Sequence, residues 1–229
     1  MNSRMEQRVI RHRLRAWIGD VLADWWKSFV SIAAIGPDSR RAKRFGAFGH
    51  HSIICFPTTT IFNERYIQIG SFTMIGEHVA LSAGMMPGQE CLTNPVVRIG
   101  DRCLIGRGCG IVGHFSIDIG NDVWTGHHVY ITDQNHGYEN LDIPISQQTQ
   151  PERAVSIGDG SWIGFGSVIL PGSRIGKHCV IGANSVVTGD IPDYSVAVGA
   201  PAKVIKQFMP GGGWVGYTER SIGGLHEVN

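Results

Sequence analysis

Residues 157–187 read IGDGSW, IGFGSV, ILPGSR, IGKHCV, IGANSV and V, a run of six-residue units in direct succession. A small residue, serine or cysteine, stands four positions after the aliphatic residue that opens each unit; the opening residues are Ile157, Ile163, Ile169, Ile175, Ile181 and Val187. A period of six matches neither an α-helix nor an alternating strand. We therefore expect a coil in which the opening residues point inward and stack on their counterparts in neighbouring turns.

The same period occurs upstream, with interruptions. The opening residues there are Ile69, Ile75 and Leu81, then Ile99, Ile105, Ile111 and Ile117, and then Ile119, Thr125 and Ile131, the last set being shifted by two residues. Two stretches that contain proline and polar residues, 84–98 and 137–156, break the period. We expect both to leave the coil as loops on one face, where insertions in repeat proteins often bind a ligand.

Glycine is abundant in this sequence and charge is scarce. The chain has 31 glycines in 229 residues and 17% charged residues, whereas ordinary domains contain about 7% glycine and about 25% charged residues. Glycine follows the opening residue in most units, which predicts a corner that needs a close backbone approach or a positive φ. The hydrophobic fraction of 42% excludes a disordered chain.

The cysteines and the N-terminus predict a reducing compartment. The chain has five cysteines and no CxxC pair, so we interpret them as small buried side chains and expect neither a metal site nor disulfides. The first residues lack the apolar core and cleavage site of a signal peptide, and no apolar run reaches the roughly 18 residues of a spanning helix. We therefore expect a cytoplasmic protein.

Charge divides the chain into a basic head and a mildly acidic body. Residues 1–44 hold ten Lys or Arg and four acidic residues, a net charge of +6, which leaves −5 for the rest of a chain whose total is +1. This balance does not suggest a nucleic-acid-binding protein. The sequence predicts three parts: a basic helical segment over 1–44, a coil domain over 45–206, and a tail over 207–229 that becomes a mobile arm from Met209.

Residues 7–32 place apolar side chains three and four positions apart, which predicts an amphipathic helix. We expect its apolar stripe to cap the first coil or to pack on a neighbouring subunit, because the open end of a coil has to be covered. The alternative is a peripheral membrane contact, in which the basic helix lies on an anionic surface with Trp17, Trp25 and Trp26 at the interface.

The run from Trp162 to Lys206, WIGFGSVILPGSRIGKHCVIGANSVVTGDIPDYSVAVGAPAKVIK, resembles the C-terminal part of the left-handed parallel β-helix acyltransferases. It is most similar to the sugar O-acetyltransferases, which include galactoside and maltose acetyltransferases. The resemblance implies an all-β fold, a triangular prism of parallel strands wound left-handed with three hexapeptides per coil. It also implies a homotrimer that transfers an acyl group from acetyl-CoA to a hydroxyl acceptor at sites between subunits.

His136 is the candidate catalytic residue, because it ends the last regular strand before the 137–156 loop, where the resembling enzymes have their general base. Imidazole titrates near neutral pH, so it can remove the hydroxyl proton as the new C–O bond forms. Asp133 or Glu139 could orient the ring, and Asn135 and Tyr138 could bind acceptor hydroxyls. For these four, loop solubility and turn formation are equally good interpretations.

The resemblance also assigns candidate acetyl-CoA-binding residues. Backbone contacts with the pantetheine arm match Phe165, Ala183, Thr188 and Gly189, and the basic residues near the phosphates match Lys203 and Lys206. Small residues such as Gly164 would let the arm approach the backbone, and Trp162 would wall the groove or simply pack outward. Glu77 and His78 fall near the family's acceptor site.

Two other classes of protein remain open. γ-Class carbonic anhydrases share this fold and bind zinc through histidines, but their pair spaced five residues apart is missing from this chain. A non-catalytic β-helix scaffold is the other alternative, and it would need neither His136 nor the basic pair Lys203 and Lys206. Among enzymes, serine acetyltransferases are the second choice, although they usually carry a longer N-terminal helical domain.

Overall fold

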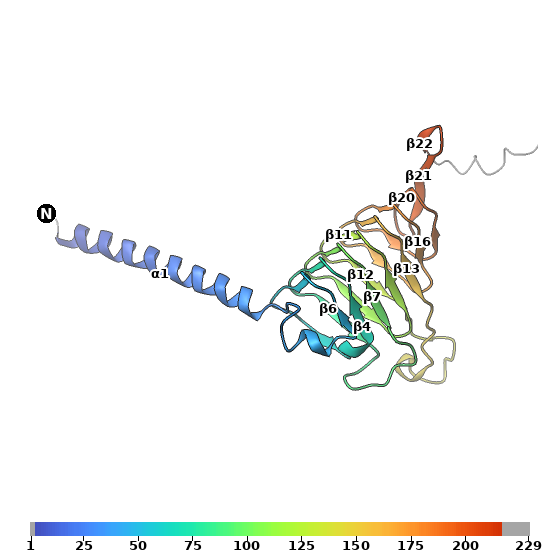
Figure 1. Cartoon of the computed structure of the whole chain (residues 1–229), viewed down its shortest axis with the longest axis horizontal. Helices are drawn as coiled ribbons and strands as arrows, with labels where there is room; N and C mark the ends of the chain where they lie inside the picture. The colour runs from blue at the N-terminus through green and yellow to red at the C-terminus, as the bar shows by residue number, and fades with distance from the viewer. Residues whose placement is uncertain (1–2, 217–229) are drawn as a thin grey trace, which may run out of the picture.

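The computed structural model describes residues 3–216 and forms a left-handed parallel β-helix with one long N-terminal helix (Figure 1). Its walls are three sheets, here called A, B and C. Sheet A contains β2 (Ile53–Ile54), β5 (Met74–Ile75), β8 (Leu104–Ile105), β11 (Trp124–Thr125), β14 (Trp162–Ile163), β17 (Val180–Ile181), β20 (Ser195–Val198), β21 (Lys203–Met209) and β22 (Gly213–Gly216). Sheet B contains β1 (Ala47–Phe48), β4 (Ile67–Ile69), β7 (Val97–Ile99), β10 (Ile117–Ile119), β13 (Val155–Ile157), β16 (Arg174–Ile175) and β19 (Asp190–Ile191). Sheet C contains β3 (Ile61–Phe62), β6 (Ala80–Ala83), β9 (Gly110–Gly113), β12 (Tyr130–Thr132), β15 (Val168–Ile169) and β18 (Val186–Val187).

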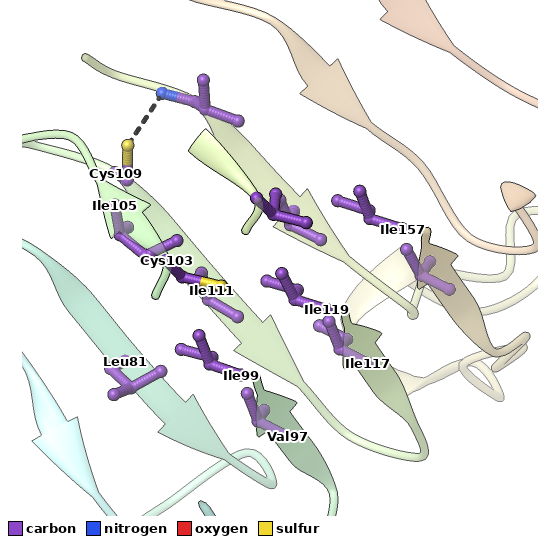
Figure 2. Close-up of a cluster of buried hydrophobic side chains, with 14 of the residues drawn as sticks. Leu81, Val97, Ile99, Cys103, Ile105, Cys109, Ile111, Ile117, Ile119 and Ile157 are labelled. Carbon is purple, nitrogen blue, oxygen red and sulfur yellow. Dashed lines mark hydrogen bonds between the residues drawn. The ribbon is translucent and has the colours of Figure 1, made fainter. Parts of the chain in front are cut away.

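The core consists of three vertical stacks of side chains, one behind each sheet. All the opening residues expected from the sequence are buried, and successive coils pair them in register, as Figure 2 shows for Ile99, Ile119 and Ile157. Burying one such side chain contributes about 1.5–3 kcal/mol, and the repetition holds the coils in line. The stacked coil predicted from the period of six is therefore confirmed, and so is the prism of parallel strands that the resemblance implies.

The glycines after the opening residues are required by close approach of the next coil. At Gly164, whose φ is not positive, an added Cβ would lie 2.6 Å from the backbone nitrogen of Ala183 in the next coil. No real Cβ tolerates such a contact, so a side chain there would push the two coils apart. Of the two explanations offered by the sequence, close backbone approach is correct at this corner.

Both expected loops leave the coil at the same corner, where the chain passes from sheet C to sheet B (Figure 1). The first occupies residues 84–96, and the second occupies residues 133–154 and contains a short 3-10 helix (Ile145–Gln147). Residues 114–116, between β9 and β10, form a shorter bulge at this corner. They account for the two-residue shift in the repeat, because Ile119 and not Ile117 stacks with Ile157.

Helix α1 (Ser3–Ala33) projects away from the β-helix, so the expectation that it caps the first coil is wrong (Figure 1). Its contact with the body is made by Phe29, whose ring meets Phe56 edge-on at 5.5 Å. The end of the coil is covered instead by the segment that follows α1. Ile35 pairs with Ile54 in an antiparallel bridge, and Ile35 and Ala42 are buried there. Two 3-10 helices lie in this region, Ala42–Arg44 and Glu64–Tyr66.

The C-terminal segment forms a hairpin as far as it is described. β21 pairs antiparallel with β20, and β22 pairs antiparallel with β21, so residues 209–216 are part of sheet A and not the mobile arm expected from Met209. Residues 217–229 of the predicted tail lie outside the described residues. Within residues 3–216, no helix is both long and apolar enough to cross a membrane.

Candidate active site

His136 lies in the 133–154 loop, four residues beyond the end of β12 and not at the strand's end as expected. Its neighbours on both sides are pinned to the returning strand of the same loop. The backbone N–H of Asn135 donates to the carbonyl oxygen of Pro151 at 3.1 Å, and that of Gly137 donates to the carbonyl oxygen of Thr149 at 3.0 Å. These bonds hold the backbone while the imidazole remains exposed.

Gln150 is the side chain whose amide lies against the His136 ring. The distance from Gln150 Nε2 to His136 Nδ1 is 3.4 Å, a long hydrogen bond. The side-chain amide of Gln134 donates to Gln150 Oε1, which fixes the orientation of Gln150. The Gln150 amide therefore lies beside Nδ1 of the exposed His136 ring.

Asp133, one of the two residues expected to orient the His136 ring, has a different role. Its side chain is fully buried, and its carboxylate oxygens accept hydrogen bonds from the backbone N–H groups of His114, Phe115 and Ser116 at 2.8, 2.9 and 2.6 Å. Asp133 therefore ties the start of the second loop to the bulge in the coil before it. A buried carboxylate is stable only when its oxygens accept hydrogen bonds. This contact therefore holds the bulge at residues 114–116 and the start of the 133–154 loop at a fixed spacing.

Glu139, Asn135 and Tyr138 are all exposed in the outer part of the loop. Glu139 Oε2 accepts the backbone N–H of Tyr138 at 3.0 Å, so its carboxylate is engaged locally. The side chains of Asn135 and Tyr138 face solvent beside His136, where they are free to meet a ligand. This placement is compatible with the binding role and with the simpler solubility role.

The structure adds a second histidine, to which the sequence pattern gives no role. His114 lies on the bulge one coil before His136, and its side chain is only 8% exposed. Its Nδ1 is 3.9 Å from Glu152 Oε1. Burial lowers the pKa of His114; the negative charges of Asp133 and Glu152 oppose that shift, and the nearby His136 adds to it. The two-residue shift in the repeat was the signal that could have pointed to this bulge.

The lowered pKa of His114 predicts acid sensitivity of the fold. An unfolded histidine, with a pKa near 6.5, takes up a proton more readily than His114 does in the folded chain. Stability is therefore full above that value and is lost as the pH falls through the lower folded-state pKa. We expect urea unfolding to give a smaller free energy at pH 5 than at pH 7.5, and His114→Gln to flatten this dependence. An unchanged slope in His114→Gln, with His178→Gln as the exposed control, would contradict the assignment.

Three of the expected acetyl-CoA-binding residues line one pocket. Thr188, Gly189 and Lys203 lie around an open cavity of about 410 Å³ at the C-terminal end of the coil. An added Cβ at Gly189 would meet nothing within 4 Å, so neighbouring protein atoms do not explain this glycine. Lys206 lies further along β21 and is exposed, on the same strand as Lys203.

Other expected residues lie at the corner where the chain passes from sheet A to sheet C. This corner is on the edge of sheet C opposite to the one from which the His136 loop leaves. Phe165 and Ala183 occupy this corner in successive coils and are exposed, whereas Gly164 is buried and is required by coil packing. Trp162 projects from the outer face of sheet A in register with Trp124. Gly164 is thus accounted for without a ligand.

Glu77 and His78 also occupy this second edge, after β5. Within one chain they are therefore separated from His136 by the width of sheet C. Among the described residues, no group of three His, Cys, Asp or Glu side chains is placed to hold a metal ion.

Comparisons with known proteins agree with this fold. The family model described as bacterial transferase hexapeptide (six repeats) matches residues 154–189, and the one described as hexapeptide repeat of succinyl-transferase matches residues 96–132. The chain is 43% identical over 110 residues to Rv3034c of Mycobacterium tuberculosis, named as a probable acetyltransferase, and the match covers 48% of this chain but only 37% of that relative.

Two further matches extend over more of the chain. WbbJ of Escherichia coli K12, named as a lipopolysaccharide biosynthesis O-acetyl transferase, is 34% identical over 150 residues, which is 62% of this chain and 76% of WbbJ. The crystal structure of a point mutant of AntD, an N-acyltransferase from Bacillus cereus, in complex with dTDP and coenzyme A, superposes with a TM-score of 0.61 over 81% of this chain and 92% of AntD. At 18% identity, the likeness to AntD concerns the fold. The match that spans three quarters of WbbJ, together with two hexapeptide models that fall on the stacked coils, shows that the chain belongs to the hexapeptide-repeat acetyltransferase family.

Proposed function

We propose that this chain transfers an acetyl group from acetyl-CoA to a hydroxyl group of a sugar or glycan, with His136 as the general base. The observation that carries the proposal is the placement of His136, exposed on a loop whose backbone is pinned on both sides of it. A catalytic base needs an accessible nitrogen on a fixed backbone, and this loop provides both.

His136 acts on the proton of the acceptor hydroxyl. Acetyl-CoA supplies the acetyl group as a thioester. His136 removes the hydroxyl proton as the oxygen forms its bond to the acetyl carbon, and it then returns that proton to the thiolate sulfur as the C–S bond breaks. No covalent enzyme intermediate is required, provided that both substrates lie together beside the ring. Gln150 lies beside Nδ1 and helps to orient the ring.

The C-terminal pocket fits the donor's polar end. Lys203 borders a cavity that Gly189 leaves open, and Lys206 follows on the same strand, so two ammonium groups are available to phosphates that leave the cavity. Backbone groups of Thr188 and Gly189 are accessible at its wall. This arrangement supports a narrow, anionic ligand that runs along the coil.

We further propose that each site forms between two subunits of a homotrimer. His136 and the residues Phe165 and Ala183 lie on opposite edges of sheet C, so a second copy is needed to bring the two groups to one groove. The outer faces of the sheets support this: sheet A exposes Met74, Trp124 and Trp162, which are 46%, 56% and 51% exposed. Sheet B instead carries charged side chains, such as the ion pair of Arg98 and Asp118 at 2.6 Å. An apolar outer face of this kind is typical of a subunit contact.

The choice of acceptor rests on WbbJ, whose name includes lipopolysaccharide biosynthesis and O-acetyl transfer. Glycan hydroxyls are weak acids that need a base, which agrees with the role given to His136. The exposed side chains of Asn135 and Tyr138 are suited to hydrogen-bond such hydroxyls.

The direct test is release of coenzyme A thiol from acetyl-CoA in the presence of pooled sugars, aminosugars and glycolipid head groups, with mass spectrometry of the acceptors. We expect thiol release that depends on an acceptor, with a mass gain of one acetyl group on that acceptor. If the protein sediments with the mass of three chains and no acceptor in the pool supports thiol release, the scaffold interpretation is favoured. A native mass of one chain would contradict the proposed shared site.

A further inference from the structure

Within residues 3–216, helix α1 makes almost no contact with the rest of the chain. It extends away from the β-helix in Figure 1, and its ring contact with the body is the one between Phe29 and Phe56, near its C-terminal end. The end of the coil is already covered by Ile35 and Ala42. The fold of the body therefore gives no reason for the long apolar helix that precedes it.

One face of α1 presents an exposed apolar stripe. Its members are separated by three or four residues, so they lie above one another along the helix. They are Leu14, Trp17, Ile18, Val21, Leu22, Trp25, Phe29 and Ile32, each between 40% and 84% exposed. From Leu14 to Ile32 the stripe runs for about 27 Å along the helix, so it is far larger than the scattered apolar side chains of an ordinary surface.

A row of arginines runs beside this stripe. Arg8, Arg11 and Arg15 are spaced three and four residues apart and are all exposed, and Arg11 and Arg15 each lie one turn before a member of the stripe. The base of the helix is followed by four more basic residues, Arg40, Arg41, Lys43 and Arg44. The opposite flank carries Asp20 and Asp24, the latter 3.5 Å from Lys27.

We propose that α1 lies in the plane of an anionic lipid surface, with its apolar stripe in the acyl boundary and its arginine row at the head groups. The net charge of the basic head favours a lipid surface over a second copy of α1 as the partner of the apolar stripe. Residues 1–44 carry +6, so pairing two copies brings like charges together, whereas an anionic head-group layer is complementary. Arginine side chains reach head groups while their stems stay on apolar surface, and tryptophans favour the same interface.

The helix lies on the surface and does not cross it. No helix in the described part of the chain is apolar enough to span a bilayer, and an amphipathic helix with a basic row is suited to the interfacial plane. The remainder of the chain carries −5, so the body is repelled by the same surface and the attachment is confined to the head. This inference does not depend on the proposed acetyl transfer.

The test uses the full chain and vesicles of phosphatidylcholine alone or mixed with phosphatidylglycerol. We expect the protein to float with the mixed vesicles and not with the neutral ones, and its tryptophan emission to shift to shorter wavelength on binding. Arg11→Gln/Arg15→Gln should weaken the partition coefficient about thirtyfold. The matched control is Arg174→Gln/Lys177→Gln, which removes two exposed charges from the body and should have no such effect.

A second variant tests the stripe itself. Leu14→Ser/Val21→Ser should abolish flotation while leaving the thermal unfolding of the β-helix unchanged, because α1 makes so little contact with the body. The proposal is overturned by absence of flotation with anionic vesicles, or by flotation that both double variants leave intact. Self-association through α1 is the other contradicting outcome. In that case the wild type forms assemblies without vesicles, Leu14→Ser/Val21→Ser dissociates them, and the protein does not bind vesicles.

Discussion

Replacing His136 by alanine is expected to lower kcat for acetyl transfer by about 10²- to 10⁴-fold, the usual contribution of a positioned general base. The KM for acetyl-CoA should change little, because the residues proposed to bind the donor, Thr188, Gly189 and Lys203, lie in a separate pocket at the C-terminal end of the coil. The measurement is steady-state thiol release with an acceptor identified from the pool.

Two variants make this result interpretable. His178→Ala removes an exposed histidine at a corner between sheets B and A, so its kcat should equal that of the wild type. Gln150→Ala removes the amide beside His136 Nδ1 and should reduce kcat by a smaller factor, because a neutral hydrogen bond of 3.4 Å contributes little. A His136→Ala enzyme that retains the wild-type kcat would refute the assignment of the base.

Replacing Asp133 by alanine is expected to destabilise the fold by about 3 kcal/mol, because each of three donors that loses its acceptor costs about 1 kcal/mol or more. The change leaves three backbone N–H groups, those of His114, Phe115 and Ser116, without their acceptor in a partly buried corner. Urea unfolding followed by circular dichroism measures the loss.

Asp118→Ala is the matched control for this prediction. It also removes an aspartate from the coil, but Asp118 is half-exposed and its ion pair with Arg98 lies at the surface. Surface ion pairs contribute about 0–1 kcal/mol, so the two substitutions should differ by about 2–3 kcal/mol. If Asp133→Ala lost no more stability than Asp118→Ala, the buried carboxylate would not be holding the corner.

Replacing Asp133 should also lower the activity that depends on His136. The same carboxylate fixes the distance between the bulge that carries His114 and the start of the loop that carries His136. We expect the surviving folded Asp133→Ala enzyme to show a lower kcat under conditions where it is still native. A positioning role of this kind is not visible in the sequence, where an aspartate three residues before the histidine suggests a partner for its ring.

The β-helix was predictable because its signal is local and repeated. Ile157, Ile163 and Ile169 each sit in the same relation to their own glycine and serine, so the period can be read without knowing any contact. The place of His136 in the second loop followed from the break in the period, whereas its catalytic role stays a prediction. The elements predicted wrongly, α1 as a cap and residues 209–216 as a mobile arm, lie outside the repeat, where no neighbouring unit repeats their pattern.

The sequence by itself determined the inward stacks and the corner from which both loops leave, because a six-residue period assigns every position to a face of the prism. Only the tertiary structure decided which loop residues meet. His114 lies near His136, and Asp133 faces away from it, because the coils stack at a fixed spacing that brings residues 17–22 positions apart into contact. Gly164 shows the same dependence on stacking: the sequence left close approach and a positive φ as alternatives, and the backbone of the next coil, 2.6 Å from an added Cβ, decides for close approach.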